Sequence, residues 1–117
     1  MTTRARVVAA HRAPDRAPIQ VHRGMRVRLG ERDGDWTDFV WTVLADGNGG
    51  WVPQQLFDVV DAGIGVARED YDTTELDADP GDELAIGPAL AQWHWARDTL
   101  GREGWIPARN IEPIEGQ

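Results

Sequence analysis

The chain has no cysteine, no lysine and only one tyrosine among its 117 residues. The lack of cysteine excludes disulfides, thiolate catalysis and cysteine-ligated zinc. No apolar run approaches the roughly 20 residues that a membrane-spanning helix needs. The Arg-rich N-terminus is followed by only a short apolar stretch at residues 7–10 (VVAA), too short for the apolar region of a signal peptide. We therefore expect a cytoplasmic protein with no membrane partner.

Signatures of catalysis are also missing. The three histidines, His11, His22 and His94, lie far apart in the sequence, and there is no Gly-rich phosphate loop, nucleophile elbow or zinc pattern. Residues 69–83 contain eight acidic residues, but their spacing is not that of a calcium-binding loop. We expect a protein that is not an enzyme and needs no cofactor or metal.

The charges are unevenly distributed along the chain, which has a net charge of −8 and a pI near 4.7. Residues 1–32 hold eight arginines and two acidic residues, whereas residues 69–83 are acidic and contain no base. The overall acidity argues against phosphate-dominated binding, so no nucleic-acid partner is expected. The acidic stretch is either a solvated loop or an arginine-binding loop. We also expect it to face the basic stretch, within the chain or in a dimer.

A Gly-Trp-aliphatic-Pro motif occurs twice, at residues 50–53 and 104–107, in a chain with six tryptophans. Matching residues upstream of both copies indicate that the chain repeats one unit. At an offset of 57 residues the matches are Ile19, Gly24, Val27, Leu29, Gly30 and Trp36 with Leu76, Gly81, Leu84, Ile86, Gly87 and Trp93. At the motif itself the offset is 54. A three-residue length difference is therefore expected after Trp36 and Trp93, where a loop can vary.

Each repeat is predicted to consist of short strands. Residues 25–31 and 82–87 alternate apolar and charged side chains, the period of a half-buried strand. Gly24 and Gly81 suit the turns that precede these strands. No stretch has a sustained helical period, and at most one 3₁₀ turn is expected after the proline of each motif.

We therefore predict an all-β chain of two small units, residues 1–60 and 65–115, joined by residues 61–65. A unit of this size buries only about 60% of the surface of its unfolded chain and is marginal alone. The short connection suggests that the units pack against each other.

The second repeat resembles the Src-homology-3 (SH3) family over its whole length. Four segments carry the resemblance, in the family's order: the opening strand VAREDYD (66–72), the RT loop and diverging turn ELDADPGDELAI (75–86), the tryptophan strand QWHWARD (92–98) and the closing stretch GWIPARNI (104–111). The first repeat is similar through Gly24, Trp36 and GWVPQQL (50–56), with a divergent opening strand. The resemblance implies two five-stranded barrels in tandem, each built of two small orthogonal sheets.

The resemblance also implies a function, the binding of an extended proline-rich peptide between aromatic walls. Acidic residues beside those walls pair with an arginine of the ligand. In the second repeat the resemblance places five residues at this groove: Tyr71, Glu75, Trp93, Pro107 and Asn110. In the first repeat it places Trp36, Pro53 and Leu56 there. We expect Trp36 and Trp93 to be exposed.

The partner implied is a protein or peptide segment that contains proline or arginine. Glu69 and Asn110 stand where the family has groove tyrosines, which leaves a second interpretation open. The chain is then a structural or assembly module, and its grooves are filled by the other repeat or, on self-association, by a second copy.

Overall fold

The computed structural model describes residues 3–114, which form twelve β-strands and two 3₁₀ turns. The predicted all-β class is confirmed: no α-helix occurs among these residues, and so none that is long and apolar enough to cross a membrane. The strands form two five-stranded sheets and one two-stranded sheet. In the described part of the chain neither five-stranded sheet closes on itself, so the predicted closed barrels are not observed.

The chain divides into two compact units, one of which is discontinuous in sequence. We call Met1–Arg16 together with Thr74–Gln117 the split unit, and Ala17–Thr73 the continuous unit. The predicted division into residues 1–60 and 65–115 differs from this one. The difference arises because the first strand of each repeat pairs with strands of the other repeat.

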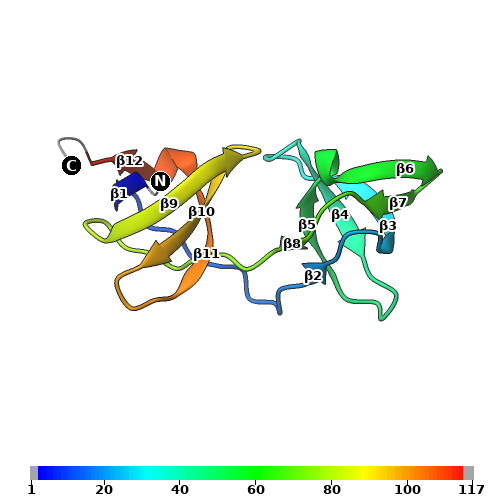
Figure 1. The fold of residues 1–117 in the computed structure, drawn as a ribbon, viewed down its shortest axis with the longest axis horizontal. Coiled ribbons are helices and arrows are strands. Elements are labelled where there is room, and N and C mark those ends of the chain that lie inside the picture. Colours follow the sequence, from blue (N-terminus) through cyan, green and yellow to red (C-terminus); the bar gives the residue numbers. More distant parts are fainter. Residues whose placement is uncertain (1–2, 115–117) are drawn as a thin grey trace. The chain divides into compact units, whose positions relative to one another are not determined.

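The split unit contains one five-stranded antiparallel sheet with the order β11-β10-β9-β1-β12. Its elements are β1 (Thr3–Val7), β9 (Glu83–Leu90), β10 (Trp93–Asp98), β11 (Glu103–Pro107), the 3₁₀ turn η2 (Ala108–Asn110) and β12 (Ile111–Pro113). In Figure 1, β1 in blue lies beside β9 in yellow and β12 in dark red, although these strands are far apart in the sequence.

The continuous unit repeats the same order as β5-β4-β3-β7-β6 and adds the two-stranded sheet β2-β8. Its elements are β2 (Gln20–Val21), β3 (Arg26–Arg32), β4 (Phe39–Val43), β5 (Gly49–Pro53), the 3₁₀ turn η1 (Gln54–Leu56), β6 (Phe57–Asp61), β7 (Ile64–Ala67) and β8 (Tyr71–Asp72).

Two predictions about the opening strands are therefore corrected. Residues 61–65 do not link the units: they end β6, turn and begin β7, which pairs antiparallel with both β6 and β3. Residues 66–72 were predicted to open the second repeat. Instead, residues 66–67 belong to β7 in the five-stranded sheet of the first repeat, and residues 71–72 form β8, which pairs with β2. Conversely, β1 pairs with β9 and β12 of the second repeat. The repeats have exchanged their first strands.

The exchange is reflected in the hydrophobic cores. In β1 (TRARV), Ala5 and Val7 are buried, while Arg4 and Arg6 are exposed. The two apolar side chains belong to a cluster whose other members all come from the second repeat: Leu76, Ala78, Leu84, Ile86, Ala96 and Ile106. Burying a valine side chain stabilises a fold by about 1.5–3 kcal/mol, so the split unit depends on β1.

Local predictions from the sequence are confirmed where they concern turns. Gly24 and Gly81 have positive φ values of 85° and 95°, in the region that glycine enters without a steric penalty. Each Gly-Trp-aliphatic-Pro strand ends in one 3₁₀ turn, η1 or η2.

The predicted match of Trp36 with Trp93 is corrected by the strand registers. Trp93 pairs with Pro107, and Phe39 pairs with Pro53. At the offset of 54, Phe39 is therefore the counterpart of Trp93. Trp36 lies in the longer loop between β3 and β4, so the length difference falls before the aromatic position rather than after it.

Candidate functional site

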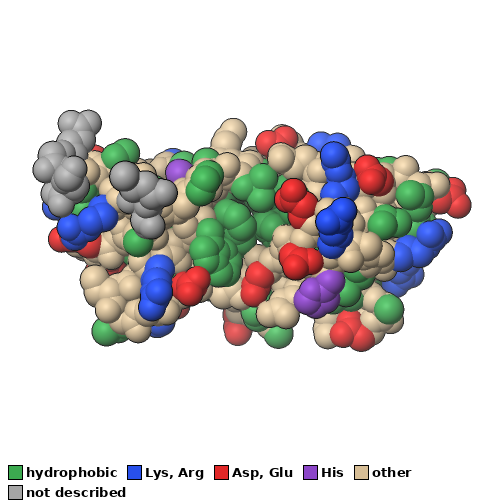
Figure 2. Space-filling model, viewed as in Figure 1, with side chains coloured by type: hydrophobic (Ala, Val, Ile, Leu, Met, Phe, Trp, Pro, Cys, Tyr) green, Lys and Arg blue, Asp and Glu red, His purple; other side chains and the backbone are tan. Residues whose placement is uncertain are grey.

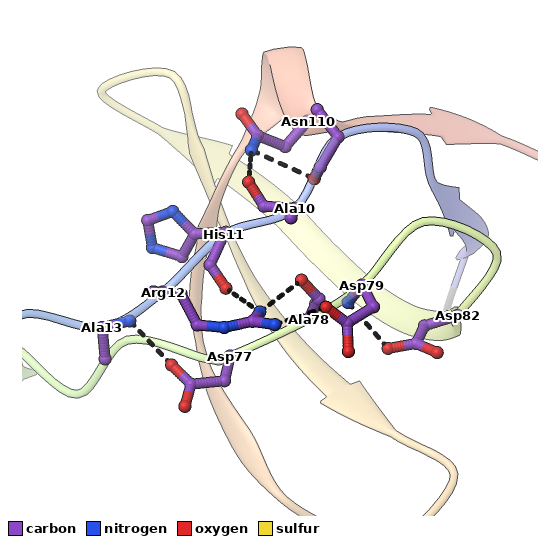
Figure 3. A network of polar contacts seen from close by, with 10 residues as sticks. Ala10, His11, Arg12, Ala13, Asp77, Ala78, Asp79, Asp82 and Asn110 are labelled. Atoms are coloured by element: carbon purple, nitrogen blue, oxygen red, sulfur yellow. Dashed lines mark hydrogen bonds and ion pairs between the residues drawn. The ribbon is translucent and has the colours of Figure 1, made fainter.

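The predicted groove of the second repeat is covered by residues of the N-terminal arm, which we define as residues 3–16. After β1 the arm runs beside the acidic segment 74–79, as Figure 3 shows. The backbone N–H of His11 donates to the Ala78 carbonyl, and the N–H of Ala78 donates to the His11 carbonyl, both at 3.0 Å. The N–H of Ala13 donates to Asp77 Oδ1 at 2.7 Å. This pairing fixes which side chains of the arm face the site.

The exposed side chain of Arg12 binds to the acidic segment. Its guanidinium donates to the carbonyls of His11 and Ala78, each at 2.9 Å, and forms an ion pair with Asp79. The hydrogen bond to Asp79 and the negative charges around it raise the pKa of Arg12 above its ordinary value. The segment therefore accepts an arginine from an extended chain, and here that chain is its own.

His11 joins the acidic position of the site to the aromatic one. Its Nε2 lies 2.9 Å from Glu75 Oε1, and the two side chains are only 14% and 21% exposed. Its ring stands edge-on to the indole of Trp93, with ring centroids 5.3 Å apart and an interplanar angle of 79°. Edge-to-face contacts of this kind are favourable because the ring edge is positive and the ring face negative. Both groups expected to bind a ligand are thus in contact with His11.

Asn110 fastens the arm on the side of the 3₁₀ turn η2. Its Nδ2 donates to the carbonyls of Ala9 and Ala10, at 3.2 and 3.1 Å (Figure 3). The backbone N–H groups of Val8 and Ala9 in turn donate to the Asn110 carbonyl. Asn110 is buried, and its amide is used to hold the arm.

The expectation that the basic and acidic stretches face each other within the chain is confirmed. Arg4 forms an ion pair with Glu83, and Arg12 forms one with Asp79. Acidic and basic side chains are interspersed on the face seen in Figure 2, with no large area of one sign there.

The continuous unit has a corresponding backbone pairing between different residues. Val21 pairs with Tyr71 in β2-β8, and at the offset of 57 Val21 corresponds to Ala78, the partner of His11. Tyr71 is therefore the counterpart of His11, supplied by the second repeat to the unit of the first. Phe39, Pro53 and Leu56 correspond to Trp93, Pro107 and Asn110.

The predicted site residues are thus divided between two units. Glu75, Trp93, Pro107 and Asn110 lie together in the split unit, whereas Tyr71 lies in the continuous unit with Pro53 and Leu56. Trp36 is half-buried in the β3–β4 loop, where its backbone N–H donates to Asp33 Oδ2 at 3.3 Å.

The predicted exposure of Trp93 is not observed. Trp93 is 8% exposed, and Tyr71, Pro107, Pro53, Leu56 and Asn110 are also buried. A shallow hollow beside Tyr71 is lined by Gln20, Val21, His22, Asp70 and Asp72. In the described part of the chain no three acidic or histidine side chains are grouped as a metal site requires.

Sequence reasoning missed His11, the residue that joins Glu75 to Trp93. The signal was present as a second repeat offset: Ala5, Val7 and His11 precede Gly65, Ala67 and Tyr71 by 60 residues, in the same alternation. Comparisons of the chain with models of protein families, with curated proteins and with solved structures found no match.

Proposed function

We propose that this chain is a non-catalytic assembly module of two SH3-like units, in which exchanged segments fill the faces that would otherwise take a peptide. Both five-stranded sheets have equivalent strand orders, β11-β10-β9-β1-β12 and β5-β4-β3-β7-β6. This equivalence supports the SH3-like assignment of both units. A cytoplasmic location is part of the proposal, and the absence of cysteine fits it.

The observation that carries the proposal is the double contact of His11 with Glu75 and Trp93. A peptide-binding face needs an available carboxylate and an open aromatic slot. At this site the carboxylate is engaged by the imidazole, and the indole is 8% exposed. A ligand would have to displace the arm, which is also held by Asn110 and by the backbone pairing of His11 with Ala78.

The test is a titration of the ¹⁵N-labelled chain with a degenerate library of peptides that contain proline and arginine. We expect no saturable shift of the Trp93 indole N–H signal. Saturable binding that is lost in Glu75→Gln, but kept in the matched control Glu112→Gln on exposed β12, would contradict the proposal.

A second candidate function, capture of an external peptide with proline and arginine, is favoured by the contacts of Arg12. Arg12 and Pro14 belong to the segment HRAPDRAP (11–18), which has the composition expected of such a ligand. Its guanidinium binds the Ala78 carbonyl and the Asp79 carboxylate, and an arginine of an external peptide could bind in the same way. The same titration distinguishes the two functions, since only the second requires a peptide to displace the arm.

A further inference from the structure

The N-terminal arm makes its described backbone pairings with the split unit alone. β1 pairs with β9 through Thr3–Ile86, Arg4–Ala85, Ala5–Leu84 and Arg6–Glu83, and with β12 through Ala5–Pro113, Arg6–Glu112 and Val7–Ile111. Beyond β1, the backbone N–H groups of Val8 and His11 donate to the carbonyls of Asn110 and Ala78. The N–H of Ala13 donates to the side chain of Asp77. The arm is thus a docked segment that completes a sheet and a hydrophobic core.

The continuous unit is complete without the arm. Its five-stranded sheet and its two-stranded sheet use only residues between Gln20 and Asp72. Its buried apolar side chains lie between residues 19 and 71: Ile19, Val21, Val27, Phe39, Val40, Val52, Leu56, Phe57, Ala67 and Tyr71. Release of the arm would leave this unit intact.

Residues 14–18 (PDRAP) connect the docked part of the arm to the continuous unit, and all five are exposed. Within this segment the described backbone hydrogen bond runs from Arg16 N–H to the Pro14 carbonyl at 2.9 Å. Pro14 and Pro18 have no N–H to donate, and proline favours extended backbone. The connection therefore has the composition of a hinge that can carry the arm to a different acceptor without breaking a sheet.

We propose that the arm of a second copy of this chain can replace the arm of the first, so that two chains form a dimer by reciprocal exchange of the arm, residues 3–16. The partner copy then contributes β1 and His11 to the site beside Trp93.

This inference rests on the proposed assembly function. In the dimer each arm makes the same contacts as in the monomer. Dimer formation is therefore opposed only by the change at the hinge and by the loss of the favourable intramolecular docking. Intramolecular docking corresponds to an effective concentration in the millimolar range for a short linker. The dimer should therefore form when the chain refolds at concentrations approaching that value.

The exchange can be trapped because the chain has no cysteine. In Arg4→Cys/Ala85→Cys the new thiols lie on directly paired residues of β1 and β9. The variant is unfolded under reducing conditions, refolded at about 10 µM to about 1 mM and oxidised, and the products are separated on a non-reducing gel. We expect a monomer with an internal disulfide at low concentration and a growing fraction of disulfide-linked dimer at high concentration.

The matched control is Arg28→Cys/Val43→Cys, which places the thiols on paired residues of β3 and β4 within the continuous unit. It should give only monomers under the same conditions. A second measurement needs no cysteine: equal amounts of ¹⁵N-labelled and unlabelled wild-type chain are refolded together and examined by native mass spectrometry. Mixed dimers that form on co-refolding and survive brief dilution support the exchange.

Monomers at every concentration, in both the disulfide and the mass measurements, would overturn the inference. That result leaves the proposed function standing if the peptide titration also finds no binding. Peptide binding lost in Glu75→Gln would instead contradict the proposed function, whatever the disulfide pattern.

Discussion

His11 stands edge-on to Trp93, with ring centroids 5.3 Å apart, although the first residue belongs to one repeat and the second to the other. The contact exists because β1, a strand of the first repeat, pairs with β9 of the second. The counterpart of His11 is Tyr71, a residue of the second repeat that pairs with Val21 in the unit of the first. Each unit thus contains buried residues from both repeats.

Trp93→Ala is expected to destabilise the chain by about 3–5 kcal/mol, because it removes a large buried aromatic side chain from the split unit. Urea denaturation followed by circular dichroism measures the change. The control is Leu100→Ala, at a side chain that is 77% exposed, which should change the free energy of unfolding by no more than about 0.5 kcal/mol. A Trp93→Ala variant as stable as this control would show that the indole is not buried.

Gly104→Ala is expected to lower the free energy of unfolding of the split unit by about 1–3 kcal/mol. A Cβ at this position would lie 2.7 Å from the backbone carbon of Glu75 and from the backbone nitrogen of Leu76. The backbone there cannot move aside without disturbing the bond from Leu76 N–H to the Trp105 carbonyl. Thermal melting of Gly104→Ala and of Gly87→Ala makes the comparison, since the nearest atom to a Cβ at Gly87 is 4.0 Å away. Equal melting temperatures would contradict the close approach.

The interaction of His11 with Glu75 is expected to give a coupling free energy of roughly 0.5–1.5 kcal/mol in a double-mutant cycle with His11→Ala and Glu75→Ala. The side chains are mostly shielded from water and 2.9 Å apart. The exposed pair Arg68 and Asp58, at 3.8 Å, serves as the control and should give a coupling close to zero. If the two cycles give the same value, His11 is not anchoring the arm.

Asp98 is expected to make stability depend on pH below about pH 5. Burial acts to raise its pKa, but hydrogen bonds from the backbone and side chain of Arg102 and from the N–H of Leu100 outweigh burial, so the pKa is lowered. A lowered pKa in the folded state means that the carboxylate stabilises the fold above its unfolded pKa of about 3.9, and that this contribution is lost as pH falls through the folded value.

The difference in unfolding free energy between wild type and Asp98→Asn should therefore be constant above pH 5 and shrink as the pH is lowered to about 2. Urea denaturation at a series of pH values measures it, with Glu112→Gln as the control for a general loss of charge. A difference that does not change with pH would mean that the Asp98 hydrogen bonds do not depend on its ionisation.

Much of the local structure could be predicted from the sequence, because local physics decides it. Gly24 and Gly81 adopt the positive φ values that turns require, and the strand alternation near them is obeyed. Charge predicted that the acidic stretch would face the basic one, within the chain or in a dimer, and the structure identifies Arg4 and Arg12 as residues that pair with it. These features do not depend on which core a strand joins.

The exchange of first strands could not be predicted, because β1 and β7 occupy equivalent positions in two sheets that have the same strand order. The alternation of Ala5 and Val7 predicts a half-buried strand but does not distinguish between the two sheets. Trp36 was matched to Trp93 because a loop of different length lies beside it, and sequence spacing alone does not locate an insertion. The groove residues predicted from the sequence are therefore divided between the two units.

The most direct test of the exchange is to compare two fragments, residues 17–73 and residues 1–61, by thermal and urea unfolding. Residues 17–73 contain every strand of the continuous unit, whereas residues 1–61 lack β7, which lies between β3 and β6 in its sheet. We predict a cooperative transition for residues 17–73 and none for residues 1–61. A cooperative transition for residues 1–61, with residues 17–73 unfolded, would show that each repeat keeps its own first strand and would contradict the account.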